Sequence, residues 1–171
     1  MKTALKCILL FFFSLLSSAA ICFSQTTAAT NKIISKEIST TVDRVKMLQL
    51  VNNVRRKGCQ CGDTYYRPAP PLLWNAQLES AAYNHTTDMA KNNFFSHTGT
   101  DGNRGGNRLE NLGYHWKTFG ENIGQGYKTE KDVIDGWLAS PGHCKNIMDK
   151  TFTELGAAHI GNLWTQDFGS R

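Results

Sequence analysis

The segment at 137–148, with the sequence WLASPGHCKNIM, constrains the fold of this chain more than any other stretch. Helical patterning reaches Trp137, and Ser140-Pro141 then ends that helix and begins another. Serine suits the N-cap because its hydroxyl accepts a hydrogen bond from a free backbone N–H. Proline suits the first helical position, where no N–H is needed. His143 therefore lies in the first turn of a short helix, beside Cys144, and is a candidate site residue.

The N-terminus has the pattern of a secretory signal peptide. Lys2 and Lys6 precede an apolar run at 8–16, and small residues follow it. We expect a signal peptide at 1–24, a flexible leader rich in Ser, Thr and Ala at 25–41, and one domain at 42–171. The alternatives are a lipoprotein signal that uses Cys22 and an uncleaved membrane anchor. Cleavage would give a secreted protein, extracellular or periplasmic, with no stable membrane span.

The charge balance argues against a nucleic-acid partner. The full chain carries a formal net charge of +5, and loss of Lys2 and Lys6 lowers it by 2 to +3. The basic residues are scattered apart from a cluster at 55–57, which we interpret as a solvated helix end favoured by the helix dipole. An excess this small supports neither nucleic-acid binding nor attraction to an anionic membrane.

Three cysteines remain after the signal peptide: Cys59, Cys61 and Cys144. An oxidising compartment favours a disulfide, and an odd number leaves one thiol free. A single residue separates Cys59 from Cys61, which strains disulfide geometry, so we expect one of these two to pair with Cys144. The alternative is a zinc site formed by the three thiolates and His143, although such close ligands fit the usual spacing poorly.

Hydrophobic periodicity predicts helices first and a small antiparallel sheet last, which indicates the α+β class. Asn75 and Thr129 are good helix caps, Gly161-Asn162 suits a tight hairpin turn, and the glycine-rich segment 58–62 is expected to be a loop. His85 falls on an apolar helical stripe, where we expect a buried, hydrogen-bonded structural histidine. The predicted helices are 42–57, 75–92, 108–112, 129–139 and 141–148, and the predicted strands are 119–124, 153–160 and 163–168.

Four motifs, in this order, resemble the CAP superfamily, which includes cysteine-rich secretory proteins, antigen 5 and plant pathogenesis-related proteins. They are Ser96-His97-Thr98-Gly99, Gly120-Glu121-Asn122-Ile123, the segment 137–148, and Thr153-Glu154-Leu155-Gly156 with Trp164-Thr165-Gln166-Asp167-Phe168-Gly169. The resemblance spans about residues 48–169 and looks like the compact bacterial branch. It implies an α-β-α sandwich with a small antiparallel sheet between helices.

The resemblance also implies a cleft lined by two histidines and acidic residues. The matching positions are His97, His143 and Glu121, while Ser140 stands where many eukaryotic members have a second glutamate. Two imidazoles are suitable ligands for Zn²⁺, with Glu121 as a third ligand or as the group that orients a bound water. The alternative is a hydrogen-bonded His–Glu–His cluster that fixes three loops without a metal.

We expect an extracellular binding or interaction module rather than an enzyme. The resemblance implies small apolar ligands, such as sterols or fatty acids, in some members and cell-surface partners in others. The main alternative is a metal-assisted hydrolase of peptide or cell-wall substrates, with Glu121 as general base. A structural envelope protein with a vestigial cleft is the third hypothesis.

Overall fold

The structure is a computed structural model that describes residues 42–171. The expected signal peptide and leader lie outside the described residues. No helix within 42–171 is both long and apolar enough to cross a bilayer. The helices are α2 (Arg44–Lys57), α3 (Ala76–Asn92), α4 (Gly105–Asn111), α5 (Glu130–Ala139) and α6 (Pro141–Met148). The strands are β1 (Cys59–Cys61), β2 (Thr64–Tyr66), β3 (Leu73–Trp74), β4 (Thr118–Gln125), β5 (Glu154–Ile160) and β6 (Leu163–Ser170).

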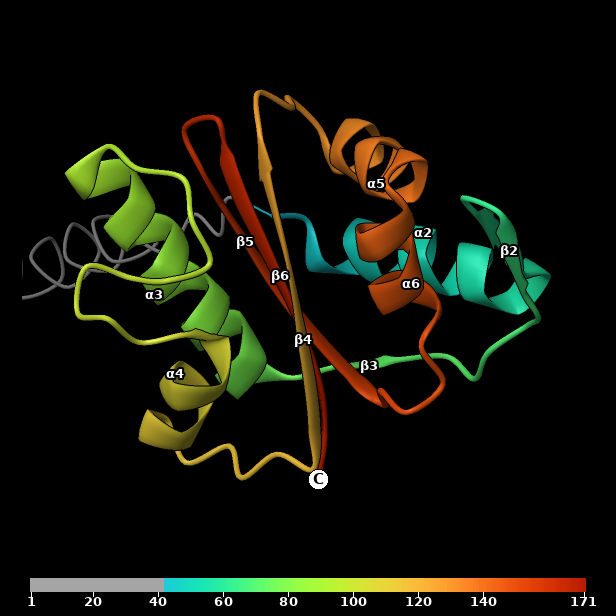
Figure 1. Ribbon diagram of the computed structural model, residues 1–171, viewed down its shortest axis with the longest axis horizontal. Helices are drawn as coiled ribbons and strands as arrows, with labels where there is room; N and C mark the ends of the chain where they lie inside the picture. The colour runs from blue at the N-terminus through green and yellow to red at the C-terminus, as the bar shows by residue number, and fades with distance from the viewer. Residues whose placement is uncertain (1–41) are drawn as a thin grey trace, which may run out of the picture. The chain divides into compact units, whose positions relative to one another are not determined.

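A four-stranded sheet separates two layers of helices (Figure 1). Its strand order is β3-β5-β6-β4, in which β6 pairs antiparallel with both β5 and β4. The short β3 adds two residues parallel to β5 and is the one departure from the expected antiparallel pattern. Helices α3 and α4 lie on one side of the sheet, and α2, α5 and α6 lie on the other. The predicted α-β-α sandwich is therefore confirmed.

Local signals set the helix starts. The side chain of Asn75 accepts hydrogen bonds from the first backbone N–H groups of α3, and Thr129 accepts one from Asp132 at the start of α5. Ser140 is different: it occupies the N-cap of α6, but its side chain makes no capping hydrogen bond. The proline at the first helical position, Pro141, accounts for the start of α6 instead.

The segment 58–62 was expected to be a loop, and this prediction is wrong. Its central residues form β1, which pairs with β2 as an antiparallel hairpin in a separate two-stranded sheet. The turn consists of Gly62 and Asp63, and Gly62 adopts a φ of +58°, which favours glycine. The two tyrosines and the threonine of β2 favour a strand, whereas Gly58 and Gly62 suggested a loop.

The main core lies between the sheet and the layer of α2, α5 and α6. Its largest buried side chains include Trp137 of α5 and Trp164 of β6. Trp137 Nε1–H donates to the carbonyl of Ile123 at 3.0 Å, and Trp164 Nε1–H donates to that of Tyr127, also at 3.0 Å. Both indole donors are therefore satisfied within the core, as burial requires. A smaller apolar cluster lies under α3 and α4.

Arg55 is buried in this core, so the interpretation of 55–57 as a solvated helix end is wrong for its first residue. The guanidinium donates to four backbone carbonyls and thereby holds the turn after α6 against α2. Burial lowers the pKa of Arg55 to about 10, an effect that Asp149 partly opposes, so the group stays charged at neutral pH. The acceptors are Pro70 at 2.7 Å, Ile147 at 2.8 Å, Asp149 at 2.8 Å and Phe152 at 3.3 Å.

Replacing Arg55 by Ala should lower the free energy of unfolding by about 3–5 kcal/mol, because buried carbonyls lose their donors and a cavity remains. Arg56→Ala is the matched control, since its side chain is exposed and should change stability by no more than about 0.5 kcal/mol. Urea unfolding of the two variants and the parent measures both effects. Equal stabilities of the two variants would contradict this role of Arg55.

Candidate functional site

Glu121 is the centre of a buried polar group on the α3–α4 side of the sheet. Its side chain is only 4% exposed. Oε1 lies 2.6 Å from His97 Nδ1, and Oε2 forms an ion pair with the guanidinium of Arg108. The structure thus brings together two of the predicted site residues, His97 and Glu121, and adds an arginine.

Strand and helix geometry explain this meeting. Successive side chains of β4 point to opposite faces of the sheet, so Glu121 faces α4 while Asn122 faces α6. Arg108 projects from α4 and also donates to the backbone carbonyls of Asn103 at 2.9 Å and His97 at 3.3 Å. One arginine therefore fixes both the carboxylate and the loop that carries the histidine.

A second carboxyl group, Asp167, lies beside Glu121. The two residues are direct partners in the antiparallel pairing of β4 with β6. Asp167 is completely buried, and neither of its carboxyl oxygens accepts a hydrogen bond from a donor within residues 42–171.

The two carboxyl groups have pKa values shifted in opposite directions. Burial, and next the charge of Glu121, raise the pKa of Asp167 well above its ordinary value. Burial also raises the pKa of Glu121, but the hydrogen bond from His97 and the charge of Arg108 outweigh it and leave that pKa lowered. These opposite shifts mean that Glu121 ionises before Asp167 as the pH rises.

His85 of α3 completes the buried group. It is 1% exposed, and its Nε2 lies 2.8 Å from the backbone carbonyl of Ser96, so the expected buried, hydrogen-bonded role is observed. Burial lowers the pKa of His85, although the charge of Glu121 opposes this shift. A neutral His85 that donates from Nε2 holds the start of the loop leading to His97.

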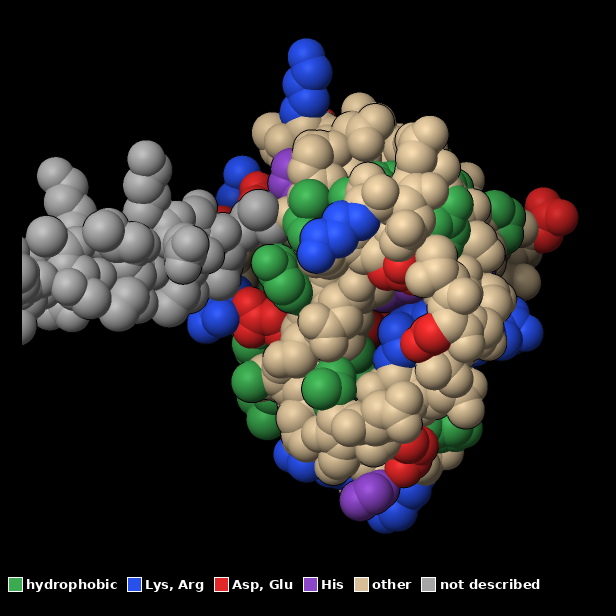
Figure 2. All heavy atoms as spheres, turned by 90° about the vertical axis from the view of Figure 1, so that its left-hand side faces the viewer, with side chains coloured by type: hydrophobic (Ala, Val, Ile, Leu, Met, Phe, Trp, Pro, Cys, Tyr) green, Lys and Arg blue, Asp and Glu red, His purple; other side chains and the backbone are tan. Residues whose placement is uncertain are grey.

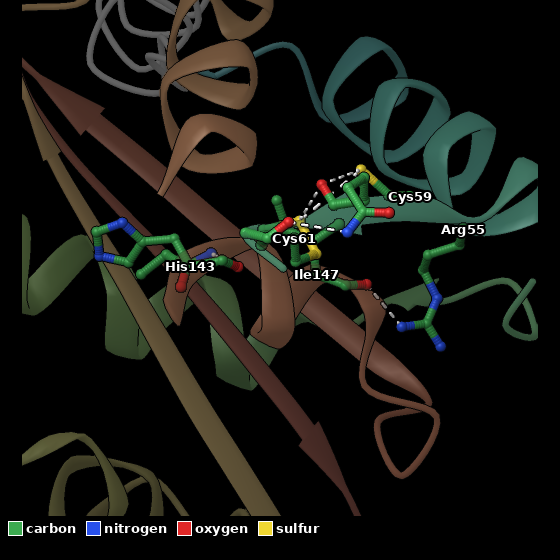
Figure 3. The surroundings of a disulfide bond; sticks show 9 residues. Arg55, Cys59, Cys61, His143 and Ile147 are labelled. Atoms are coloured by element: carbon green, nitrogen blue, oxygen red, sulfur yellow. Dashed lines mark hydrogen bonds between the residues drawn. A yellow bond between two sulfur atoms is a disulfide. The ribbon is translucent and has the colours of Figure 1, made fainter. Parts of the chain in front are cut away.

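The other two predicted site residues, His143 and Ser140, lie on the α6 side. His143 is half-buried, and its ring points away from the neighbouring disulfide (Figure 3). Burial lowers the pKa of His143, and the charge of His97 lowers it further. Neither His143 nor Ser140 lines the pocket described below that contains His97 and Glu121. The nearby bridge joins Cys61 to Cys144, one of the two pairings that the sequence left open.

The donor atoms of His97, Glu121 and His143 do not meet the geometry of a three-ligand metal site. Within residues 42–171, one group of three or more potential ligands has all its donor atoms within 4.8 Å of one another, and it consists of the three cysteines. Both oxygens of Glu121 are already bonded to protein groups. As arranged, these three residues do not form a preassembled zinc site, and the prediction that they bind zinc is tested by the titration described below.

A pocket of about 500 Å³ opens beside this polar group. One wall is aromatic: the rings of Trp116 and Phe119 lie 5.9 Å apart, and Trp116 Nε1–H donates to the carbonyl of Gly106 at 3.1 Å. A Cβ on Gly105 would overlap the Phe119 ring, so this wall needs glycine in α4. The lining residues are His97, Arg104, Gly105, Gly106, Asn107, Glu110, Trp116, Phe119 and Glu121.

A smaller pocket of about 290 Å³ lies between α3 and the loop that follows it. Figure 2 shows the α3 side of the molecule, where acidic, basic and histidine side chains meet in a hollow. Arg108 and His85 contribute to the lining of this second pocket, together with Asp88 and Asp101. Arg108 thus reaches the smaller pocket while it holds the carboxylate of the larger one.

Sequence reasoning did not identify Arg108 and Asp167 as site residues. Asp167 had a usable signal, because a carboxylate between Trp164 and Phe168 in a predicted strand must be buried or face a site. Arg108 had none, because its role depends on where α4 packs.

The fold is that of a CAP domain. The sequence profile of the CAP, or cysteine-rich secretory protein, family matches residues 48–168, which is more than half of the chain. The chain therefore belongs to this family.

Two proteins of Bacillus subtilis (strain 168) are similar in sequence. The uncharacterized protein YkwD is 31% identical over 145 residues, which cover 84% of this chain and 53% of YkwD. The uncharacterized membrane protein YlbC is 31% identical over 136 residues, which cover 80% of this chain and 36% of YlbC. The chain therefore spans about half of one curated relative and about a third of the other.

Solved structures show the same fold. An extracellular protein containing a SCP domain from Bacillus anthracis str. Ames is 30% identical, with a TM-score of 0.66 over 74% of this chain and 39% of that chain. A cysteine-rich secretory protein, SAV1118, from Staphylococcus aureus subsp. aureus Mu50 is 17% identical, with a TM-score of 0.60 over 74% and 38% of the two chains. The second likeness supports the fold alone.

The free energy of unfolding of Asp167→Asn, relative to that of the parent, should increase as the pH rises. Above about pH 4, ionisation of this carboxyl group lowers the free energy of the unfolded chain. In the folded protein the raised pKa keeps the group protonated over part of this range, so the folded state does not gain the same stabilisation. The stability that the protonated group contributes at acid pH is therefore lost as the pH rises toward its folded-state pKa. Asparagine removes this loss, so the difference from the parent should grow by about 1.4 kcal/mol per unit of pKa elevation.

Urea unfolding between pH 4 and pH 7 measures this difference, and Asp63→Asn, at an exposed position, is the matched control. A difference between Asp167→Asn and the parent that stays constant or shrinks over this range would show that Asp167 is ionised in the fold.

Proposed function

We propose that this protein is an extracellular binding module whose 500 Å³ pocket holds a small ligand with an apolar ring or chain and one hydrogen-bonding group. One observation carries the proposal: the pocket combines an aromatic wall, Trp116 and Phe119, with a polar floor, Glu121, whose partners already fix it. The 30% identical relative from Bacillus anthracis, which is described as an extracellular protein, supports the location.

The floor suits binding because it is preorganised. Arg108 and His97 hold both oxygens of Glu121, so a ligand meets a carboxylate that is fixed in position and largely neutralised. Trp116 remains 39% exposed and offers a flat apolar surface to a ring or chain. Most small-molecule sites combine such apolar surface with a few fixed polar groups.

The same geometry gives less support to a hydrolase. A general base needs a carboxylate oxygen that can take a proton from water, and its pKa is usually raised toward the working pH. Glu121 has no oxygen free of a protein partner, and its pKa is lowered. We therefore place the metal-assisted hydrolase second.

The ligand class can be tested by isothermal titration with three probes: a medium-chain fatty acid, a sterol and a soluble peptidoglycan fragment. Trp116→Ala should weaken binding of the accepted probe at least about tenfold, because the aromatic wall is removed. Tyr83→Ala is the matched control, since Tyr83 is 52% exposed and lies outside the pocket lining. Its affinity should stay within about twofold of the parent.

Binding that is equal in Trp116→Ala and the parent, or no binding of any probe, would contradict the proposed pocket. Turnover of a peptide or peptidoglycan substrate that disappears in Glu121→Gln would favour the hydrolase instead.

Zinc titration is a separate test of the cleft residues. Because the donor atoms of His97, Glu121 and His143 do not converge, the parent and the double variant His97→Ala/His143→Ala should give the same zinc isotherm. Both proteins keep Cys59, so any binding by the free thiol cancels in the comparison. An affinity at least about tenfold weaker in the double variant would show that the two rings share an ion.

A further inference from the structure

The three cysteines gather where β1 packs against α6. Cys61 and Cys144 form the disulfide, with Cα atoms 5.5 Å apart, and Cys59 is the free thiol. Cys59 and Cys61 are two positions apart on one strand, so their side chains lie on the same face of β1. Figure 3 shows Cys59 beside the disulfide. The short strand β1, which the sequence analysis did not predict, therefore places the sulfurs of Cys59 and Cys61 next to Cys144.

The sulfur atoms are close enough to react with one another. Cys59 Sγ lies 3.8 Å from Cys144 Sγ, and all three sulfurs lie within 4.8 Å of each other. A thiol 3.8 Å from a disulfide sulfur is near the contact distance from which thiol–disulfide exchange starts, and a rotation of the Cys59 side chain would bring it in line with the S–S bond. Cys59 is also partly accessible, whereas Cys61 is only 4% exposed. The thiol left free is thus the one that solvent can reach.

We propose that Cys59, Cys61 and Cys144 form an intramolecular thiol–disulfide exchange site, in which the bridge to Cys144 moves between Cys61 and Cys59. Cys59 loses its proton to water, and the thiolate attacks Cys144 Sγ. The bond from Cys144 to Cys61 breaks, and Cys61 leaves as a thiolate that takes up a proton. One S–S bond forms and one breaks, so the exchange needs no external oxidant or reductant. It does not depend on the proposed ligand pocket.

The surroundings of Cys59 keep the exchange slow at neutral pH. Burial raises the pKa of the Cys59 thiol, and no neighbouring charge offsets this. Burial is the whole cause of the shift, with no contribution from the titratable groups on the surrounding elements, which include Lys57 of α2, Tyr65 and Tyr66 of β2, and His143 and Lys145 of α6. Since the thiolate is the attacking species, the exchange should accelerate about tenfold for each pH unit below the thiol pKa.

Trapping the free thiol tests the proposal in the intact oxidised protein. Samples are held at pH 6, 7.5 and 9, quenched with acid, alkylated with N-ethylmaleimide and digested with pepsin at acid pH, which prevents later reshuffling. Fragment-ion mass spectra then locate the label. We expect label on Cys61 as well as Cys59, appearing faster at higher pH and at a rate independent of protein concentration. Label confined to Cys59 at every pH and time would overturn the proposal.

Single replacements provide the matched pair. Cys61→Ser should form the Cys59–Cys144 bridge in full under the oxidising conditions in which Cys59→Ser forms Cys61–Cys144. Two free thiols in folded Cys61→Ser would show that Cys59 cannot reach Cys144 as a partner and would also overturn the proposal. If Cys61→Ser fails to fold, the labelling of the parent protein decides the matter.

Discussion

The burial of one negative charge on β4 shapes the face of the sheet that carries the pocket. Glu121 sits in a strand, directly opposite Asp167, where two ionised carboxylates would repel each other strongly. The raised pKa of Asp167 disfavours its ionised form, and Arg108 and His97 both bond to Glu121. The positions of α4 and of the loop before it follow from that requirement, because each delivers one partner of the carboxylate.

On the face of the sheet that packs against α2, α5 and α6, polar side chains position helix α6. Asn122 donates to Gln166 at 3.1 Å and to the backbone carbonyl of His143 at 3.3 Å, while Asn146 donates to Asn122 at 2.9 Å. Arg55 donates to the carbonyl of Ile147 near the end of α6, and the disulfide to Cys144 fixes the first turn of the helix. Helix α6 lies in the segment that most constrains the fold. It is fixed by the side-chain amides of Asn122 and Asn146, by the buried Arg55 and by the disulfide.

Local interactions explain which parts could be predicted from the sequence. Asn75 and Thr129 act on their own helices, so their patterns predicted the starts of α3 and α5 closely. Arg55 could not be placed, because an arginine at a helix end is normally solvated and only the packing of the turn after α6 buries it. The β1–β2 hairpin was missed because Gly58 and Gly62 suggested a loop.

The candidate site shows the same division. The motif resemblance predicted that His97 and Glu121 lie in one cleft, and the structure places their side chains 2.6 Å apart. It could not predict that Arg108 pairs with the second oxygen of the glutamate, since the packing of the short helix that carries Arg108 leaves no local signal in the sequence. This one missed residue changes the electrostatics of the site, because Arg108 pairs with the second oxygen of Glu121 and compensates its charge.

The three cysteines and the pocket lie on opposite sides of the four-stranded sheet, and α6 carries Cys144 on the cysteine side. Cys144 and His143 are adjacent on this helix, yet the ring of His143 points away from the sulfurs (Figure 3). The amides and Arg55 hold α6 independently of the disulfide, so a change of bridging partner does not release the helix. A bridge that moves by two residues along β1 therefore alters the edge of the fold and leaves the carboxylate, its arginine and the aromatic wall in place.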